Sequence, residues 1–419
     1  MNSLVPLSEL VTRVRGGGTP SRAVSAYWNG PIPWASVKDL TKQTFEMGDT
    51  VEHISSRGLA SSSASLIPAG TPIISTRMAV GKAAIPVVDI AINQDLKALY
   101  PASHVDPRYL TRILQFIEPK VEAVSVGSTV RGVSVGQLLK FQVFAPPLPE
   151  QRYIADILDA ADDQICATEQ VIAKLRLTRI GLVNNLLTWG ISAASRPHES
   201  WSKPCGLNSS MNYPIPHGWS VGSVYEWCDR MTVGVVNSAT HAYVDSGIPF
   251  IRSQNVKPGY IDLRGVLHIT KEYNAQQSSS ILREGDVVVV RTGYPGTAAV
   301  VPKELSGANC FSLLVVTPRK SVLIPEYLAL YLNSEFCRRQ IDQLHFGSAQ
   351  HNLNLAELKR LPLPVPSSAE QTEIVETVVS ADNLISAEQS AVDKLHLLKA
   401  TLSTALLSGH VRIPKDAIS

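Results

Sequence analysis

The chain has 419 residues, of which 44% are hydrophobic and 18% charged, and its formal net charge is +2. This length allows two or three domains, and the composition is typical of a globular protein rather than a disordered one. No run approaches the roughly 18 apolar residues of a membrane span, the N-terminus lacks a secretory signal, and the scattered cysteines form no Cys-x-x-Cys pair. We expect a cytoplasmic protein with no membrane contact, disulfide framework or metal site.

Residues 1–149 have the pattern of a mixed α/β domain. The stretch "TPIIST" (71–76) predicts a buried strand, and "DPRYLTRILQFI" (106–117) predicts an amphipathic helix. A closing helix is expected in "SVGQLLKF" (134–141), with Ser134 as its N-cap.

Residues 150–189 predict one long helix. Pro149 and Glu150 suit its first turn, and Gly190 suits its end. Apolar residues recur at steps of four and three, which is the seam of a coiled coil, and Thr168 and Arg179 interrupt it. The predicted seam consists of Ile154, Leu158, Ala161, Ile165, Ile172, Leu175, Leu182 and Leu186.

A polar linker, residues 190–212, precedes a second α/β domain at residues 213–369. Here "GDVVVVR" (285–291) predicts a buried strand followed by the turn "GYPGT", and "IPEYLALYLNSEFC" (324–337) predicts a helix. A closing helix is expected in "NLAELKRL" (354–361), with Asn354 as its N-cap.

Residues 370–410 predict a second long helix, followed by a tail at 411–419. Ser368 and Gln371 have the spacing of a capping box, and Gly409 suits the helix end. Glu388 and Lys399 interrupt its seam, which consists of Ile374, Val378, Ala381, Ile385, Val392, Leu395, Leu402 and Leu406. Matching seams favour packing of the two helices, each about 57 Å long if about 38 residues are helical.

The long helices belong to a whole-chain repeat. "GSTVRG…PPLPEQ" (127–151) aligns with "GSAQHN…PSSAEQ" (347–371) at a constant offset of 220 residues, which continues through residue 188. Upstream the match is fainter: "IPWASVKDL" (32–40) resembles "IPFIRSQNV" (248–256), and "PAGTPIIST" (68–76) resembles "REGDVVVVR" (283–291). The poorly matched regions 1–149 and 190–369 carry net charges of +4 and +3, and the segments 150–189 and 370–419 carry −2 and −3. A polyanion should therefore bind the domains rather than the helices.

Motifs of the common enzyme classes are missing. "AVGKAA" lacks the leading glycine and the hydroxyl of a phosphate loop, and "GGG" at 16–18 precedes Thr-Pro, which favours a turn over a phosphate cradle. The sequence contains no amino-methyltransferase motif and no zinc-protease motif. This argues against a catalytic residue or a cofactor of the chain's own.

The chain resembles the specificity subunits of type I restriction–modification systems. The resemblance covers nearly the whole length and rests on "PPLPEQRYIADIL", "IPHGW", "LLSGHVRI" and the two copies of a mixed region followed by "EQ" and a heptad helix. It implies an α/β fold of two target-recognition domains separated by two long antiparallel coiled-coil helices. It further implies a non-catalytic DNA-binding subunit, each domain of which reads half of a split site in double-stranded DNA. Two methyltransferase subunits and the restriction subunits would be its partners, and these would use S-adenosylmethionine, ATP and magnesium.

Arg, Lys, Asn and Gln side chains read base edges, and small hydroxyls hold phosphates. Such residues gather in matching stretches of the two domains, although each alone also fits a solvated loop residue or a cap. The DNA-binding candidates are Lys38, Arg77, Ser128, Thr129 and Arg131 in the first domain and Arg252, Ser253, Gln254, Asn255, Lys257, Arg291, Tyr294, Ser348, Gln350, His351 and Asn352 in the second.

Two questions stay open at this point. Arg179 and Lys399 share one seam position and suit a docking point, a register pin or a side chain that reaches out to solvent. The rival functions are a specificity subunit of another restriction class or of a methyltransferase-only complex, a coiled-coil adaptor that binds only proteins, and an uncharacterised hydrolase. The half-site sequences and the spacer length cannot be read from the chain.

Overall fold

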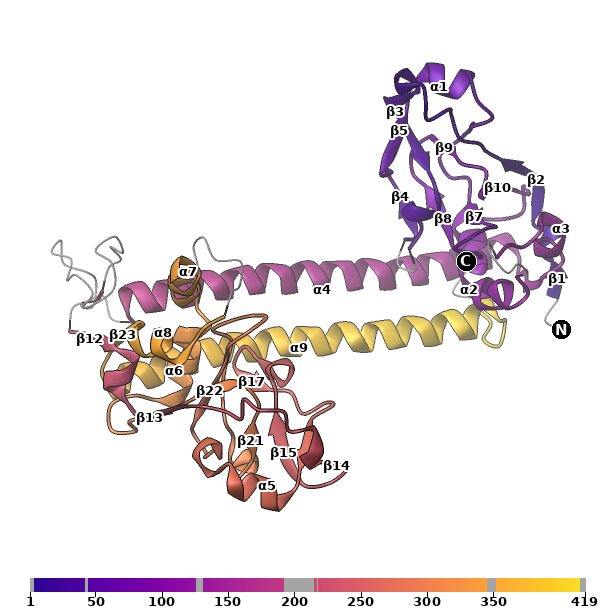
Figure 1. The fold of residues 1–419 in the computed structure, drawn as a ribbon. Helices are drawn as coiled ribbons and strands as arrows, with labels where there is room; N and C mark the ends of the chain where they lie inside the picture. Colours follow the sequence, from indigo (N-terminus) through magenta and orange to yellow (C-terminus); the bar gives the residue numbers. More distant parts are fainter. Residues whose placement is uncertain are drawn as a thin grey trace. The chain divides into compact units, whose positions relative to one another are not determined.

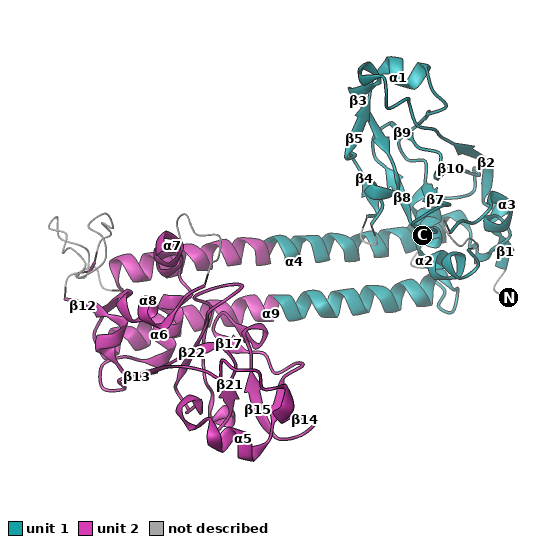
Figure 2. Cartoon of the chain, in the orientation of Figure 1, with its two compact units in different colours: residues 1–170, 389–419 teal, residues 171–388 magenta. Residues whose placement is uncertain are grey.

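A computed structural model describes residues 4–41, 44–125, 131–191, 215–216, 218–344 and 352–414. The chain divides into two compact units, residues 1–170 with 389–419 (unit 1) and residues 171–388 (unit 2), coloured separately in Figure 2. Each unit contains one mixed α/β domain and part of each of the long helices α4 (Leu148–Trp189) and α9 (Ser368–Leu407), which Figure 1 shows side by side. The division falls inside both helices, so each unit pairs the first half of one with the second half of the other.

The domain of unit 1 is built on two main sheets, ordered β2-β10-β7-β8-β4 and β5-β3-β9-β6, with a further pair β1-β11. In the first sheet β10 pairs antiparallel with both β2 and β7, and helix α2 (Pro107–Ala123) covers one face with Tyr109, Ile113 and Leu114, all fully buried. The strands are β1 (Leu4–Pro6), β2 (Val11–Gly16), β3 (Trp28–Ala35), β4 (Glu46–Met47), β5 (Glu52–Ile54), β6 (Ser65–Ile67), β7 (Ile73–Ser75), β8 (Ala83–Pro86), β9 (Ile90–Ile92), β10 (Leu96–Pro101) and β11 (Gln142–Phe144). The short helices are α1 (Ser56–Ala60) and α3 (Val135–Leu138).

The domain of unit 2 repeats this plan with sheets β13-β22-β19-β20 and β14-β18-β15-β21 and the pairs β12-β23 and β16-β17. Its strands are β12 (Ser220–Ser223), β13 (Cys228–Val233), β14 (Tyr243–Val244), β15 (Ile248–Ile251), β16 (Val256–Lys257), β17 (Tyr260–Ile261), β18 (Leu267–Ile269), β19 (Val287–Val290), β20 (Ala298–Val300), β21 (Asn309–Cys310), β22 (Leu313–Pro318) and β23 (Pro362–Val365). Its helices are α5 (Lys271–Gln276), α6 (Pro325–Leu332), α7 (Glu335–Leu344) and α8 (Leu355–Arg360).

The faint upstream repeat has a structural basis. Strand β3 pairs parallel with β9, as β15 does with β21, and each of β3 and β15 leads into a single turn of 3-10 helix at Val37–Asp39 or Ser253–Asn255. The predicted strands "TPIIST" and "GDVVVVR" are β7 and β19, and each pairs antiparallel with the next strand. The two domains therefore share a scaffold where their sequences barely match.

Several predicted helix boundaries are confirmed and two are corrected. Ser134 and Asn354 cap α3 and α8 as expected, each in a reciprocal capping box. The stretch 324–337 forms two helices, because Asn333 turns back to bond both polar groups of the Ala298 backbone. At the start of α9 the hydroxyl that accepts from the Glu370 amide belongs to Ser367, not to Ser368.

The contacts of the Glu-Gln pair at the start of each long helix explain why this pair recurs in the sequence. The buried side chain of Gln371 accepts from the Ile324 amide at 2.8 Å and donates to the carbonyls of Val322 and Pro366. Gln151 does the same in unit 1, accepting from the Asp106 amide at 2.9 Å and donating to two carbonyl groups. Each glutamine thus fastens the start of a long helix to the loop that precedes α2 or α6.

The neighbouring glutamate fastens the end of the other long helix. Glu150 accepts from the Arg412 guanidinium at 2.8 Å and from the Ile413 amide, just beyond the end of α9. Glu370 accepts from the amide of Ile191, just beyond the end of α4, and from the indole of Trp219. Two adjacent residues therefore join a domain, the start of one helix and the end of the other.

The sixteen residues of the predicted seam are each buried or half-buried along the two helices. Near the helix ends the seam joins the domain cores: Ile154, Leu158 and Leu406 lie in the core of unit 1, and Leu186, Ile374 and Val378 lie in that of unit 2. The glycines predicted to end the helices, Gly190 and Gly409, have φ of 68° and 75°.

The two cations that interrupt the seam form matching ion pairs across the helices. In unit 2, Arg179 of α4 donates to both carboxylate oxygens of Asp382 of α9. In unit 1, Lys399 of α9 donates to Asp162 of α4. Residues 162 and 179 of α4 meet residues 399 and 382 of α9, so the helices run antiparallel. Among the readings left open, this geometry favours the register pin.

We predict that Gln371→Leu destabilises unit 2 by about 2 kcal/mol, because it leaves a partly buried amide, a partly buried carbonyl and a buried carbonyl without partners. Equilibrium unfolding in urea, followed by circular dichroism, measures the change. Gln170→Ala, on the exposed side of α4, is the matched control and should cost less than about 0.5 kcal/mol. Equal effects of the two changes would contradict this role of Gln371.

A second prediction concerns pH. The pKa of Glu150 is lowered from its ordinary value of 4.5, chiefly by the hydrogen bonds from Arg412 and further by the Ile413 amide, whereas burial opposes the shift. A carboxyl group with a lowered folded-state pKa stabilises the fold above its unfolded pKa, and this stabilisation is lost as pH falls through the folded value. Arg412→Gln should therefore lower stability by about 1 kcal/mol at pH 7 and have little effect near pH 3. Thermal melts of both proteins at the two pH values test this, and a pH-independent difference would refute it.

Candidate nucleic-acid interface

In unit 1 the turn between β7 and β8 brings two predicted segments together. Arg77 forms an isolated bridge with Gly132, and the Met78 amide donates to the Arg131 carbonyl at 3.1 Å. The candidate cations Arg77 and Arg131 are both exposed and come from segments more than fifty residues apart. Met78 has φ of 63°, in the left-handed region that few non-glycine residues adopt, and its side chain is 63% exposed.

In unit 2 the turn between β19 and β20 has the same construction. Thr292 forms an isolated bridge with Asn352, and the Leu353 amide donates to the Arg291 carbonyl at 2.9 Å. Gly293, with φ of 90°, takes the place of Met78, and the following Tyr294 is 84% exposed. The candidates Arg291, Tyr294 and Asn352 thus lie in or beside one turn of the domain.

Sequence reasoning missed three cations in unit 1. Arg13 and Arg15 alternate on the edge strand β2, and Lys97 on β10 lies opposite Gly16 at the end of β2. The pKa of Lys97 is lowered, first by burial and then by the positive charge of Arg77, whereas the negative charge of Asp95 opposes the shift. The alternation "TRVR" in an edge strand was the available signal.

These cations lack acidic partners. Among the described residues none of the five forms an ion pair with a carboxylate; they are Arg13, Arg15, Arg77, Lys97 and Arg131. Some other arginines are tied to carboxylates: Arg22 pairs with Glu52 in unit 1, and Arg230, the counterpart of Arg13, pairs with the buried Asp286 in unit 2. A group of unpaired cations at a sheet edge attracts phosphate.

The predicted DNA-binding segment of unit 2 at residues 252–257 contains both buried and accessible side chains. Asn255 is 1% exposed, and its amide accepts from the Arg252 backbone and donates to the Asp262 carbonyl. Its side chain therefore holds its own loop together, and its position does not support base contact. Gln254 is exposed and Arg252, Ser253 and Lys257 are half-buried, so these candidates remain accessible.

The remaining candidates divide into two groups. Lys38 is exposed beside Ser36, whose hydroxyl caps the short 3-10 turn. Five candidates lie outside the described residues: Ser128, Thr129, Ser348, Gln350 and His351.

The described residues show no cluster of His, Cys, Asp and Glu able to hold a metal ion. Burial raises the pKa of the thiols of Cys228, Cys310 and Cys337 to about 12, so these cysteines are inert. No described helix is both long enough and apolar enough to cross a membrane.

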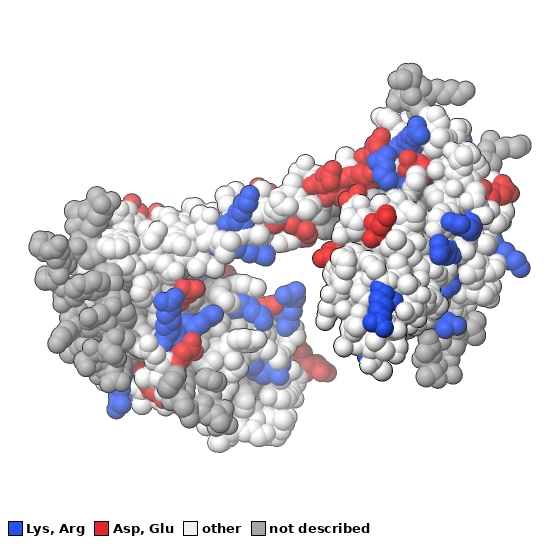
Figure 3. All heavy atoms as spheres, turned by 90° about the horizontal axis from the view of Figure 1, so that it is seen from above, with Lys and Arg blue, Asp and Glu red and all other residues white. Residues whose placement is uncertain are grey.

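Acidic side chains gather instead on the helices. In unit 1 four aspartates fall within two turns of α4, and Figure 3 shows acidic side chains collected on the helical surface beside this domain. They are Asp156, Asp159, Asp162 and Asp163. Arg108, Arg112 and Lys399 pair with three of these aspartates. This helical surface therefore offers no excess of positive charge to phosphate, and the domain edges remain as the candidate interface.

A family model and several known proteins match this chain. The family model for the type I restriction modification DNA specificity domain matches residues 3–177 and 234–395. The specificity subunit of the Escherichia coli enzyme EcoBI is 27% identical over 284 residues, which are 66% of this chain and 57% of that protein. The MjaIX specificity subunit of Methanocaldococcus jannaschii is 21% identical over 415 residues, 96% of this chain and 92% of that protein. The alignment therefore spans less than two thirds of the first relative and nearly all of the second.

Solved structures show the same fold. The type I restriction-modification S subunit from M. genitalium superposes with a TM-score of 0.53 at 13% identity, covering 97% of this chain and 96% of that one. A chain from a study of assembly of the type I R-M system gives 0.64 at 17% identity, covering 98% of each.

Proposed function

Since the chain belongs to the type I restriction–modification DNA specificity family, we propose that it is the subunit that reads the DNA sequence in such a complex. The α/β domain of each unit binds one half of a split, asymmetric site in double-stranded DNA. The two long helices set the spacing of the half-sites and receive two methyltransferase subunits.

The matching turns carry this proposal. Both domains place a turn from the central sheet beside the segment that follows the repeated Gly-Ser, yet the side chains at matching positions differ: Arg77 and Met78 in unit 1, Thr292 and Gly293 in unit 2. The shared scaffold supports a shared mode of binding, and different side chains at the same place support different base sequences.

The helices support the docking part of the proposal. Leu177 of α4 and Leu397 of α9 stand at the same position of the repeat, one in each unit, and each is 70% exposed. An exposed leucine adds nothing to the seam, and its recurrence at equivalent places suits two copies of one partner. Helices of 42 and 40 residues are about 60 Å long, which limits the spacer between half-sites.

The chemistry belongs to the partners in this proposal. The methyltransferase subunits use S-adenosylmethionine to methylate an adenine in each half-site, and the restriction subunits use ATP and magnesium. The chain itself supplies recognition and geometry without a catalytic residue or cofactor. Its place would be the cytoplasm, where the DNA is.

The experiment that tests DNA recognition removes charge from the unit 1 turn. Arg77→Gln with Arg131→Gln, in the chain assembled with its methyltransferase, should weaken duplex binding by about tenfold or more. Each lost phosphate contact should also reduce the slope of log affinity against log salt by about 1. Fluorescence anisotropy of labelled duplex across a salt series gives both quantities.

Lys174→Gln with Lys394→Gln, an equal charge change on the exposed surfaces of α4 and α9, is the control and should leave affinity nearly unchanged. Salt-independent binding, or equal losses in the turn and control variants, would favour a protein-only adaptor and contradict the proposal.

For docking, we expect Leu177→Asp and Leu397→Asp each to weaken binding of one of two methyltransferase copies, with no loss of thermal stability because both side chains are exposed. Sedimentation velocity with purified methyltransferase counts the bound copies. Thr372→Asp, exposed near the start of α9, is the control away from these leucines. Retention of two copies by the double leucine variant would place the docking surface elsewhere.

A further inference from the structure

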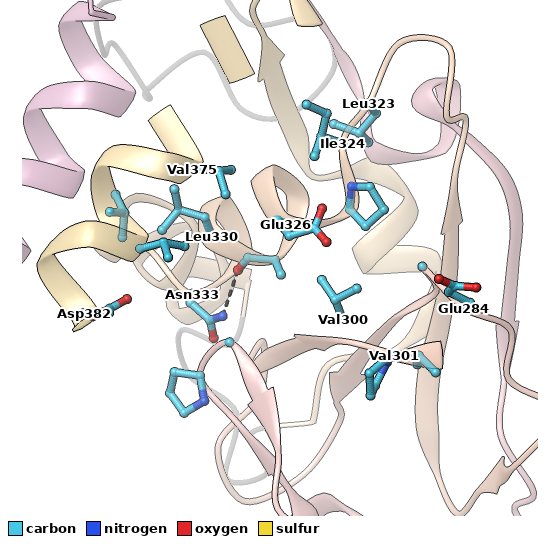
Figure 4. Close-up of a pocket in the computed structure, with 18 of the residues that line it drawn as sticks. Glu284, Val300, Val301, Leu323, Ile324, Glu326, Leu330, Asn333, Val375 and Asp382 are labelled. Carbon is cyan, nitrogen blue, oxygen red and sulfur yellow. Dashed lines mark hydrogen bonds between the residues drawn. The ribbon is translucent and has the colours of Figure 1, made fainter. Parts of the chain in front are cut away.

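Unit 2 contains a pocket of about 690 Å³ between its α/β domain and the long helices, shown in Figure 4. Its walls combine apolar and charged side chains. The apolar ones include Val300 of β20, Leu330 of α6, and Val375 and Val378 of α9. The charged ones are the carboxylates Glu284, Glu326 and Asp382 and the cations Arg179, Lys303 and Lys320. In Figure 4 the Glu326 side chain points into the space and Asp382 lies at its edge.

In unit 1 the same place is filled by the chain's own side chains. Helices α2 and α6 correspond because each has Pro at its first turn and a tyrosine that donates to the backbone of the closing strand: Tyr109 to Phe144 and Tyr327 to Pro364. By this correspondence Arg112 occupies the position of Leu330. The Arg112 side chain is 3% exposed, and its guanidinium lies 3.4 Å from the centre of the Phe45 ring.

Carboxylates of α4 complete the filled site in unit 1. Arg112 pairs with Asp159 and Asp162, each at 2.6 Å, and Arg108 pairs with Asp156 and Asp159. Asp162 also pairs with Lys399, so one carboxylate serves two cations. The site in unit 1 is thus a guanidinium held between an aromatic ring and a carboxylate on the long helix.

Unit 2 retains the carboxylate of this site but has no counterpart of the arginine or of the aromatic ring that cover it in unit 1. Asp382 corresponds to Asp162 and pairs with Arg179, as Asp162 pairs with Lys399. No cation of α6 reaches it, because Leu330 replaces Arg112. Pro258 and Gly259 line the side on which unit 1 has Phe45; the Gly259 amide bonds the Ala298 carbonyl, and a β-carbon there would meet open space.

We propose that this pocket receives an arginine side chain and a neighbouring aromatic ring from a partner polypeptide, the methyltransferase subunit that docks on unit 2. The guanidinium pairs with Asp382 and Glu326, and the ring covers it from the side of Pro258 and Gly259. The identity of the partner rests on the proposed function, whereas the chemistry of the occupant rests on unit 1.

Two observations favour a polypeptide over a small metabolite. The groups that fill the site in unit 1 are protein side chains from two different segments, α2 and the residue before β4. The pocket also continues onto the exposed surface of α9 through Val379, on the helix that the proposed function assigns to docking.

The first test uses a chemical probe. N-acetyl-Arg-Phe-amide should bind the full chain with a dissociation constant of about 1 mM, measured by saturation-transfer NMR. The same dipeptide with citrulline in place of arginine should bind at least fivefold more weakly because it is neutral. Leu330→Trp fills the pocket and should abolish binding, whereas Leu263→Trp, the same change at an exposed leucine of unit 2, should not.

A second variant fills the pocket in a different way, so that the test remains informative if Leu330→Trp does not fold. Leu330→Arg with Val379→Asp copies the Arg112–Asp159 pair of unit 1 into unit 2, and it should fold and lose the probe. Any one of three results would overturn the proposal. The arginine and citrulline probes could bind equally well, the probe could still bind both filled variants, or the wild-type chain could fail to bind the probe.

The partner itself provides the second test. Isothermal titration of the wild-type chain with purified methyltransferase should show two binding events, and the filled variants should weaken one of them at least tenfold. Equal affinity for wild type and filled variants would overturn the pocket proposal and leave the proposed function intact. Failure of the methyltransferase to bind the wild-type chain would overturn both.

Discussion

The buried glutamine at the start of each long helix is the contact on which the rest of the structure depends. A long helix is stiff, so the direction it takes from a domain is set within its first turn. Gln151 and Gln371 fix that direction by bonding three backbone groups of the preceding loops, which no apolar side chain could do. Because the next glutamate holds the end of the opposite helix, each domain is bonded to both helices at one place.

The sequence was most informative where one repeat supports the other. The heptad seam, the Glu-Gln pair and the helix ends are local patterns, and finding each twice made their assignment firm. The ambiguity of Arg179 could not be resolved in this way, because its partner Asp382 lies 203 residues away. Asn255 shows a similar limit: its residue type suits both a base contact and a loop brace, and only the position of the Asp262 carbonyl distinguishes them.

Differences between the two units are as informative as their likeness. Arg13, at the edge of unit 1, lies over the Tyr100 ring and forms no ion pair with a described carboxylate, whereas its counterpart Arg230 is held by Asp286, a buried carboxylate that needs a cation. Arg112 fills a site that Leu330 leaves open. The two domains thus share a backbone scaffold. They differ in which charged side chains are held in internal ion pairs and which are exposed to a binding partner. These differences between the two repeats are visible in the aligned sequences. Their structural effect, however, depends on burial and on contacts with residues distant in the chain.

The ion pairs also explain how one register of the helix pair is selected. A heptad seam is nearly unchanged by a slip of seven residues, so apolar packing alone fixes register only weakly. A slip in one direction would place Asp382 opposite Leu186 and Asp162 opposite Leu406, and the opposite slip would set them against Ile172 and Val392. Either slip places carboxylates against apolar side chains and separates Arg179 from its partner, at a cost well above the small net gain of an exposed ion pair. These ion pairs therefore act mainly by disfavouring wrong registers. Because one such pair occurs in each unit, the same register is favoured along both helices.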